Sequence, residues 1–504
     1  MSARWQAGKE KLLGSPHQGD EEYEDDKKLS ASEHEALIKR WQGGLSPRFR
    51  EDYGSWLQSG SMNVSLLEGN IYFHPSLLIG KGAAAEVYLG IQPSDGREVA
   101  VKILEVEDDE NDLIAKHFEE LRSTLKCHAA IPGMVQYINS FERTFKGRRK
   151  KMREMVVVLE LMEGSVADAM RTWKENHHVG TLAHLEVIRY VSVSLLHTLA
   201  NLHHRQSKDG KDLVHPDVKP DSIMLDHLGQ IRLADSGFAK FVDKKADHLF
   251  EPPEALQHGG ATSTSDLYSL GMVMLSMMLA SPHGEDVPQD PGGQQEVLRT
   301  KLPAWPKHQA FCFAQLLHAL LHQDWKRRGF FNWTPSDILP HRLVLCHPFF
   351  WSASTGLRFL VTLGTYNSED CQFQLRQFKG LEKAVQEAVS AALLAFGGKS
   401  WFDVVADLET GSRATMEDRN SNPFGLLKFI CNKSIQLNDG MDLDRLQRDP
   451  EIFQKRFPEL VARCWEALLE NSINIIRGRM EHTRLREFFE RPIDLESFRA
   501  AELA

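Results

Sequence analysis

Several features that would assign this sequence to a special class are missing. The six cysteines, at positions 127, 312, 346, 371, 431 and 464, form no closely spaced pair. This spacing argues against a disulfide framework or a zinc site, and it favours a reducing compartment. The longest apolar run, about residues 270–280, is too short to span a bilayer. No internal repeat with a period of about 20–50 residues is present, so we expect neither a membrane span nor a repeat array.

The sequence also lacks a basic start followed by an apolar segment, so we expect no signal peptide and a cytoplasmic location. Its net charge of −10 provides no overall attraction to nucleic acid. We therefore expect no DNA binding, and any RNA binding has to come from a local patch. The basic segment 146–153 is either such a patch, for RNA or an acidic partner, or a solvated hairpin.

What is present is an ordinary composition for two or three globular domains, with 42% hydrophobic and 26% charged residues in 504. Residues 1–70 form a polar, partly disordered extension, because they are rich in charge and poor in apolar residues. Residues 71–350 begin with short strands between turn signals and become mostly helical beyond about 185. Residues 351–490 are helical throughout, and 491–504 form a tail. This order predicts an α+β fold with two lobes, followed by an all-α domain.

Two local patterns are specific enough to be checked against a structure. Residues 283–296 are polar with several glycines and prolines, which predicts an exposed loop within the helical lobe. A later stretch has apolar residues at helical spacing, which predicts a helix that ends before Gly397. These apolar positions are Leu381, Val385, Ala388, Val389 and Ala392.

A glycine-rich turn opens the first strand pair of the smaller lobe. Gly80 and Gly82 allow the chain to bend tightly enough for backbone N–H groups to approach phosphates, and Val87 follows on the next strand. The strand Val99-Ala100-Val101-Lys102 then ends in a cation. Alone, these patterns also fit a plain hairpin turn and a solvated strand edge.

The most specific stretch runs from Leu213 to Leu225 and contains His215-Pro216-Asp217-Val-Lys219-Pro220-Asp-Ser222. Further landmarks follow in order. These are Ala234-Asp235-Ser236-Gly237, Pro253-Glu254 and Ser265-Asp266. Together with the glycine turn and Lys102, this order and spacing resemble the protein kinase family over about 270 residues.

The resemblance implies that the protein binds ATP and Mg²⁺. Asp217 would accept the proton of the substrate hydroxyl, Lys219 would steady the γ-phosphate, and Asp235 and Ser222 would hold the metal. Glu119 and Glu120 both lie where the helical partner of Lys102 belongs, and we prefer Glu120. The implied nucleotide-binding set comprises Gly80, Gly82, Val87, Ala100, Lys102, Glu120, Glu160 and Met162. Within it, Glu160 and Met162 mark the segment that contacts adenine.

Three departures from the kinase pattern affect phosphoryl transfer more than nucleotide binding. Pro216 replaces the arginine that receives an activation-loop phosphate in regulated kinases. Ser222 replaces an asparagine that binds the second Mg²⁺, and a hydroxyl is a shorter and poorer oxygen donor. Ser236 replaces the phenylalanine that packs beneath the metal-binding aspartate. We therefore expect ATP binding with weakened phosphoryl transfer.

The C-terminal region resembles a second type of domain. Residues 424–433, 453–461 and 482–489 are similar to helices of the kinase-extension nuclease (KEN) domain found in ribonuclease L and in the unfolded-protein sensors. In that family an Arg-Asn pair, a His four residues after the Asn, and a Tyr cleave RNA by acid–base chemistry. The alternative is an unrelated helical appendage.

The implied nuclease site is degenerate in this sequence. Cys431 stands at the arginine position, Asn432 is kept, and Gln436 replaces the histidine. Glutamine cannot exchange a proton near pH 7. After Tyr366 there is no tyrosine, and after His347 the only histidine is His482. We therefore expect the nuclease activity to be lost.

The kinase–KEN resemblance implies a nucleotide-responsive switch that pairs as a homodimer, or as a heterodimer with a relative, and binds RNA weakly if at all. Three functions remain open. The first is an ATP-binding scaffold or regulator with weak kinase chemistry. The second is an active Ser/Thr protein kinase. The third is a working endoribonuclease that uses unusual groups.

Overall fold

The computed structural model of the chain describes about three fifths of its residues. These are 65–67, 71–81, 85–92, 97–107, 113–146, 151–205, 213–215, 217–234, 248–254, 262–302, 305–333, 340–366, 381–394, 401–405, 423–435, 449–476, 485 and 487–490. The chain divides into two compact units. The sheet unit is Met1–Ser165 with Met224–Ala246, and the helical unit is Val166–Ile223 with Asp247–Ala504.

The sheet unit is built on a six-stranded antiparallel sheet. In spatial order the strands are β1 (Ser65–Leu67), β2 (Ile71–Lys81), β3 (Ala85–Gln92), β4 (Arg97–Glu107), β6 (Lys151–Glu160) and β5 (Tyr137–Lys146). The basic segment joins β5 to β6, with Lys146 opposite Lys151. It therefore lies at a hairpin, and residues 147–150 are outside the described part of the chain.

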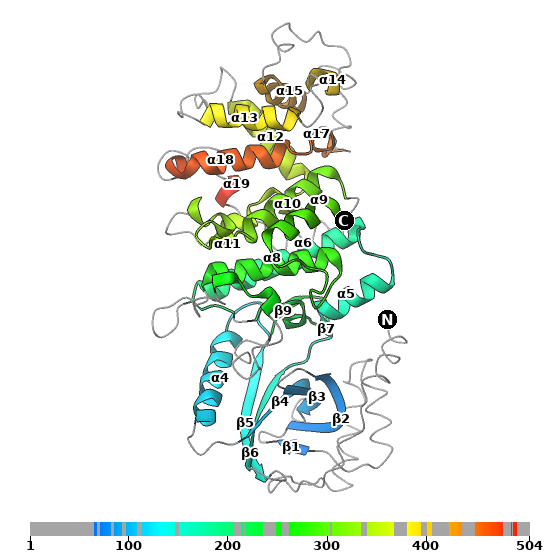
Figure 1. Ribbon diagram of the computed structural model, residues 1–504, viewed down its shortest axis with the longest axis vertical. Coiled ribbons are helices and arrows are strands. Elements are labelled where there is room, and N and C mark those ends of the chain that lie inside the picture. Colours follow the sequence, from blue (N-terminus) through cyan, green and yellow to red (C-terminus); the bar gives the residue numbers. More distant parts are fainter. Residues whose placement is uncertain are drawn as a thin grey trace. The chain divides into compact units, whose positions relative to one another are not determined.

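The two faces of this sheet are separated by the alternation of side chains along each strand. One cluster comprises Ile71, Phe73, Val99, Val101, Ile103, Phe141, Val156 and Val158. The other comprises Ala85, Leu104, Met155 and Val157 from the sheet, with Phe118, Leu121 and Leu125 from α4 (Leu113–Ala129). Figure 1 shows α4 running alongside β5. A second, three-stranded sheet contains β7 (Gly164–Ser165), β8 (Ile223–Leu225) and β9 (Ile231–Leu233).

The first part of the helical unit surrounds two long buried helices. In chain order it contains α5 (Val166–Glu175), α6 (Leu182–His203), η1 (Pro220–Ser222), η3 (His248–Phe250), α8 (Ser263–Leu279), α9 (Pro291–Thr300), α10 (Lys307–Leu320), η4 (Arg328–Trp333), α11 (Pro340–Leu345) and η5 (Pro348–Phe350). Helix α6 begins at its N-cap Thr181, whose hydroxyl accepts a hydrogen bond from His184 N. Helix α8 is apolar on nearly all sides, so it can pack against both α6 and α10.

The loop predicted over residues 283–296 is only partly correct. Helix α9 begins inside it, at Pro291, and the Asp290 side chain caps it by accepting from Gly293 N at 2.8 Å. An aspartate followed by proline is a standard start signal for a helix, because proline needs no N–H partner in the first turn. The glycines at 292 and 293 obscured that signal.

The C-terminal helices belong to the same compact unit as the helical lobe. They are α12 (Ala353–Tyr366), α13 (Leu381–Leu394), α14 (Trp401–Val405), α15 (Pro423–Ile435), α17 (Ile452–Arg456), α18 (Leu460–Ile476) and α19 (Glu487–Glu490). The helix predicted from apolar spacing is α13, and all five predicted positions are buried. Of the helices that the structure describes, none is long and apolar enough to cross a membrane.

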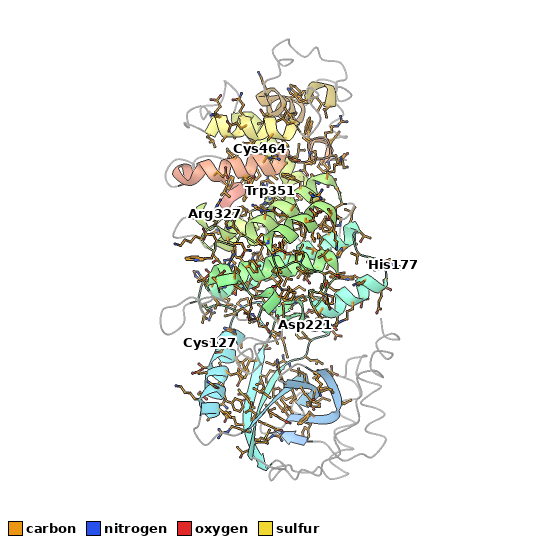
Figure 2. All side chains as sticks on the ribbon, viewed as in Figure 1. Cys127, His177, Asp221, Arg327, Trp351 and Cys464 are labelled. Carbon is orange, nitrogen blue, oxygen red and sulfur yellow. The ribbon has the colours of Figure 1, made fainter. Side chains whose placement is uncertain are left out.

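An aromatic cluster joins these helices to the lobe before them. The Trp465 ring of α18 lies 5.2 Å from Phe330, 5.0 Å from His347 and 5.6 Å from Phe489. Gln315 of α10 links the two parts again, because its Nε2 donates to Glu466 Oε2 at 2.7 Å. Trp351 and Cys464, both labelled in Figure 2, are buried in the same region. Residue 350 is thus a boundary of sequence resemblance, and the core continues across it.

Candidate active site

Within the sheet unit, three of the predicted nucleotide-binding residues lie side by side on neighbouring strands. Gly80 pairs with Val87, and Val87 pairs with Lys102. Ala100 lies two residues before Lys102, so both face the side of the sheet that α4 covers. Only 9% of Lys102 is exposed. Gly82 lies outside the described residues.

The predicted adenine-contacting segment follows β6. Glu160 is held through both its backbone and its side chain. Its N–H donates to Gln136 O at 3.0 Å, and its carboxylate accepts from Gln136 N at 2.7 Å. Met162 is buried. These contacts hold the segment against the start of β5, and the contact with adenine stays a prediction.

Helix α4 carries the two candidate partners of Lys102. Glu120 is exposed, while Glu119 accepts from Arg122 Nη1 at 2.8 Å. Arg122 also donates to Ser140 and Glu142 of β5, at 3.1 and 2.8 Å, so it ties the helix to the sheet edge. The pairing of Glu120 with Lys102 stays a prediction.

In the helical unit, the catalytic loop (residues 213–225) presents an acid and a cation together. Lys219 Nζ lies 3.0 Å from Asp217 Oδ2, with 21% and 26% of the two side chains exposed. A carboxylate held beside an ammonium group stays ionised and can accept a proton. The two residues predicted to carry phosphoryl transfer are therefore adjacent and open to solvent.

Ser222 lies inside the loop, and its role as a metal ligand stays a prediction. The side chain is fully buried, and its hydroxyl donates to Asp217 O at 2.7 Å and to Lys219 O at 2.9 Å. The same oxygen accepts from Lys219 N at 3.0 Å. Serine is short enough to close the loop on its own main chain, which the sequence pattern alone did not indicate. The hydroxyl therefore ties together the main chain of the loop.

A buried carboxylate holds the start of the catalytic loop in place. Asp266 of α8 accepts from His215 N at 2.9 Å, and its Oδ2 lies 2.6 Å from His203 Nε2. All of these groups are buried, so the paired aspartate fixes where the loop begins. Asp266 was part of a predicted landmark, whereas His203 had no sequence signal.

A buried ion pair anchors the Pro253-Glu254 landmark. Arg328 is fully buried, and its Nη2 lies 3.0 Å from Glu254 Oε2. Burial alone would raise the pKa of Glu254, but the hydrogen bonds from Arg328 hold that pKa below its usual value. Both residues are therefore charged and mutually satisfied, which is what a buried pair requires.

The predicted Mg²⁺ ligands cannot be assembled from the described residues. Ser222 is engaged elsewhere, and Asp235 lies outside the described part of the chain. Within that part, no group of three or more His, Cys, Asp or Glu side chains could hold a metal ion. The assignment of Mg²⁺ to Asp235 and Ser222 therefore stays a prediction.

The nuclease position that is predicted to be degenerate lies on α15. Cys431, which stands at the arginine position of the resemblance, is buried against α12, with its Sγ 3.4 Å from Thr365 Oγ1. Gly364 allows this close crossing, because a Cβ there would lie 2.4 Å from Leu427 O and 2.6 Å from Cys431 Cβ. The side chain therefore faces the core and not a phosphate. The side chain of Asn432, and residues Gln436 and His482, lie outside what the structure describes.

Comparison with known proteins matches residues 73–344 to the model of the protein kinase domain. Similar proteins include the L-type lectin-domain containing receptor kinase V.7 of Arabidopsis thaliana, 27% identical over 41% of this chain and 30% of the relative. Cyclin-dependent kinase 15 of Mus musculus is 28% identical over 40% and 44%. Serine/threonine-protein kinase 36 of Pongo abelii is 25% identical over 55% and 19%.

The chain thus spans between 19% and 44% of the length of these relatives. The match to the family covers more than half of this chain and contains most of the sheet, the catalytic loop and both buried pairs described above. The chain belongs to the protein kinase domain family.

Proposed function

We propose that this protein is an ATP-binding regulator of the kinase fold in which phosphoryl transfer is weakened. Its C-terminal helices would act as a KEN-like scaffold without nuclease activity. One observation carries the proposal. The catalytic loop keeps the Asp217–Lys219 pair partly exposed, whereas the Ser222 hydroxyl is buried and hydrogen-bonded to the main chain of the loop.

Nucleotide binding requires fewer groups than transfer does. Lys102 can hold the α- and β-phosphates, and Asp235 can hold one Mg²⁺ bridging the phosphates. Efficient transfer needs the developing charge on the γ-phosphate to be neutralised as well. With the second metal position unsupported, binding would persist while the rate falls.

A second candidate is an active Ser/Thr kinase, which the adjacent Asp217 and Lys219 favour. The relatives whose names state serine/threonine-protein kinase activity support the same reading. An endoribonuclease is disfavoured, because Cys431 is buried and cannot supply a cationic fork to a phosphate. Pairing of two chains through the kinase and KEN-like regions, and weak RNA binding, are part of the proposal that rests on the resemblance alone.

The proposal is tested first by thermal unfolding with Mg-ATP at millimolar concentration. Bound nucleotide should raise Tm by mass action, and Lys102→Met should remove the shift. Absence of a shift in the unmodified protein would contradict the proposal at its base. Sedimentation with and without ATP then checks for a nucleotide-favoured dimer.

Phosphoryl transfer is measured separately, as autophosphorylation. We expect a slow rate that Asp217→Asn lowers by about 10²–10⁴-fold, because this carboxylate is the base of the loop. A fast rate that depends on Asp217 would favour the active kinase instead. The Asp217→Asn protein should keep its ATP-induced Tm shift, which separates loss of chemistry from loss of binding.

A further inference from the structure

Four charged or titratable side chains meet beside the catalytic loop, at the surface of the helical unit. Asp168 and Arg171 come from α5, Asp221 from η1, and His283 from the loop after α8. Arg171 Nη1 lies 2.7 Å from Asp168 Oδ1, and its Nη2 lies 3.0 Å from His283 Nε2. His283 Nδ1 lies 3.7 Å from Asp221 Oδ2. Asp221 is labelled in Figure 2.

The contacts define the proton arrangement on His283. A guanidinium can only donate hydrogen bonds, so His283 Nε2 must accept from Arg171. The proton of the neutral imidazole is then on Nδ1, which is the atom nearest the Asp221 carboxylate. His283 thus accepts from α5 on one side and directs a proton toward the catalytic loop on the other.

The turn that carries His283 is fixed by a glycine and by hydrogen bonds. Gly284 adopts φ +73°, and a Cβ at this position would collide with Leu249, so only glycine fits. Ser281 Oγ donates to Glu285 Oε2 at 2.8 Å and accepts from Asp286 N at 3.1 Å. The imidazole is therefore presented from a fixed backbone, although 51% of its side chain is exposed.

Asp221 is connected to the reactive pair through its neighbour. Ser222 follows directly, and its hydroxyl bonds the main chain of Asp217 and Lys219. A shift of Asp221 would be transmitted to both residues by these short contacts. Burial raises the pKa of Asp221, and the nearby His283 and Arg171 act in the opposite direction.

We propose that His283 is a positioning residue that latches the catalytic loop to α5, because it accepts a hydrogen bond from Arg171 and lies within ion-pair distance of Asp221. Its kinetic consequence rests on the proposed function, while its structural consequence does not. The charged groups around it are Asp168, Arg171 and Lys174 of α5, Lys219 and Asp221 of the loop, and Glu285 and Asp286 of its own turn.

The test is hydrogen exchange of the full-length protein, followed on peptides within residues 213–225. His283→Ala should speed exchange in these peptides by about 3–10-fold, the effect of losing one or two exposed charge contacts. His283→Gln should restore slow exchange, because a carboxamide supplies both an acceptor and a donor. His318→Asn, at an exposed histidine of α10, is the matched control and should change nothing.

The rate of phosphoryl transfer provides a second readout. Autophosphorylation by His283→Ala should show a lower kcat with an unchanged KM for ATP.

Each result decides one point. Equal exchange in His283→Ala and the unmodified protein would overturn the latch. So would a His283→Gln protein as loose as His283→Ala, since packing of the ring would then be responsible. If the unmodified protein binds no ATP or transfers no phosphate, the proposed function fails, and the exchange data still decide the latch.

Discussion

The catalytic loop and helix α15 both carry positions that family resemblance assigns to chemistry, and the structure treats them differently. In the loop, Asp217 and Lys219 are adjacent and partly exposed. On α15, Cys431 is buried against α12. In each region the structure describes one residue that departs from the pattern of the resemblance, Ser222 in the loop and Cys431 in the helix. In the loop the departure, Ser222, closes the main chain and leaves the reactive pair accessible. In the helix the departure joins the core.

Under the proposed function, these two positions would lose their chemistry in two ways. A short polar residue in a loop redirects its hydrogen bonds to the nearest backbone groups. A small, weakly polar residue on a helix is free to face a neighbouring helix and become part of the packing. The first change leaves a site whose activity further substitutions could raise. The second removes the site from the surface.

The largest expected effect tests whether the C-terminal helices are structural partners of the kinase lobe. Trp465→Ala should lower the free energy of unfolding by about 3–5 kcal/mol, because it opens a cavity among Phe330, His347 and Phe489. Chemical denaturation measures the loss of unfolding free energy. Hydrogen exchange of α10 and η4 reports whether the loss reaches the kinase lobe. Trp325→Ala, at an exposed tryptophan, is the control. An independent appendage would lose α18 while α10 stayed protected.

The next effect tests the burial of Cys431 directly. Cys431→Arg should destabilise the protein by about 3 kcal/mol or more, since the guanidinium would be placed without a partner against Leu427 O and Gly364. We expect no RNA cleavage, with or without Gln436→His. Lys428→Arg, on an exposed position of the same helix, should be neutral. A stable Cys431→Arg protein that cleaves RNA would mean that α15 presents this position to solvent.

The elements were predictable from sequence where periodicity and order were strong. Helix α13 has the predicted buried face, and the sheet contains the strand with Lys102. Tertiary choices were less accessible. Leu427 and Cys431 are four residues apart, so helical spacing alone could have placed Cys431 on the apolar face. The KEN resemblance instead implies a charged side chain at this position.

Other parts of the site had no sequence signal at all. Asp221 and His283 are 62 residues apart, and Arg171 lies 50 residues before Asp221. Their meeting depends on how α5, η1 and the turn after α8 pack. The hydrogen bonds of Ser222 depend on the backbone path of the loop, which residue types do not determine. Contacts of this kind are non-local, and pattern reasoning addresses only local structure.

A smaller effect concerns pH at the junction between the two parts of the helical unit. Burial lowers the pKa of His347 to about 3, against an ordinary value of 6.5. The native protein therefore holds this imidazole neutral, and the unfolded chain binds the extra proton below pH 6.5. Its contribution to stability is complete above pH 6.5 and is lost as pH falls toward 3, by about 2 kcal/mol at pH 5.

The measurement is the free energy of unfolding from pH 7.5 to 5.0. His347→Asn keeps an acceptor for Phe349 N but cannot titrate, so its pH slope should be shallower by that amount. Other buried histidines contribute to both proteins and cancel in the difference. His318→Asn should retain the full slope, because His318 is exposed. Identical slopes for the unmodified protein and His347→Asn would show that His347 reaches solvent.

The smallest expected effect returns to the loop. Ser222→Ala should cost about 1–2 kcal/mol, because Asp217 O, Lys219 O and Lys219 N lose their partner in a buried place. Ser222→Thr keeps the hydroxyl and should recover part of the loss. Ser222→Asn separates the two roles of this position. If the hydroxyl only closes the loop, asparagine should bring no increase in autophosphorylation and no tighter binding of Mn²⁺ to the ATP-loaded protein. A Ser222→Asn protein with faster autophosphorylation and tighter Mn²⁺ binding would show that position 222 does reach the metal. The loop would then differ from α15 because it lacks only one carboxamide ligand.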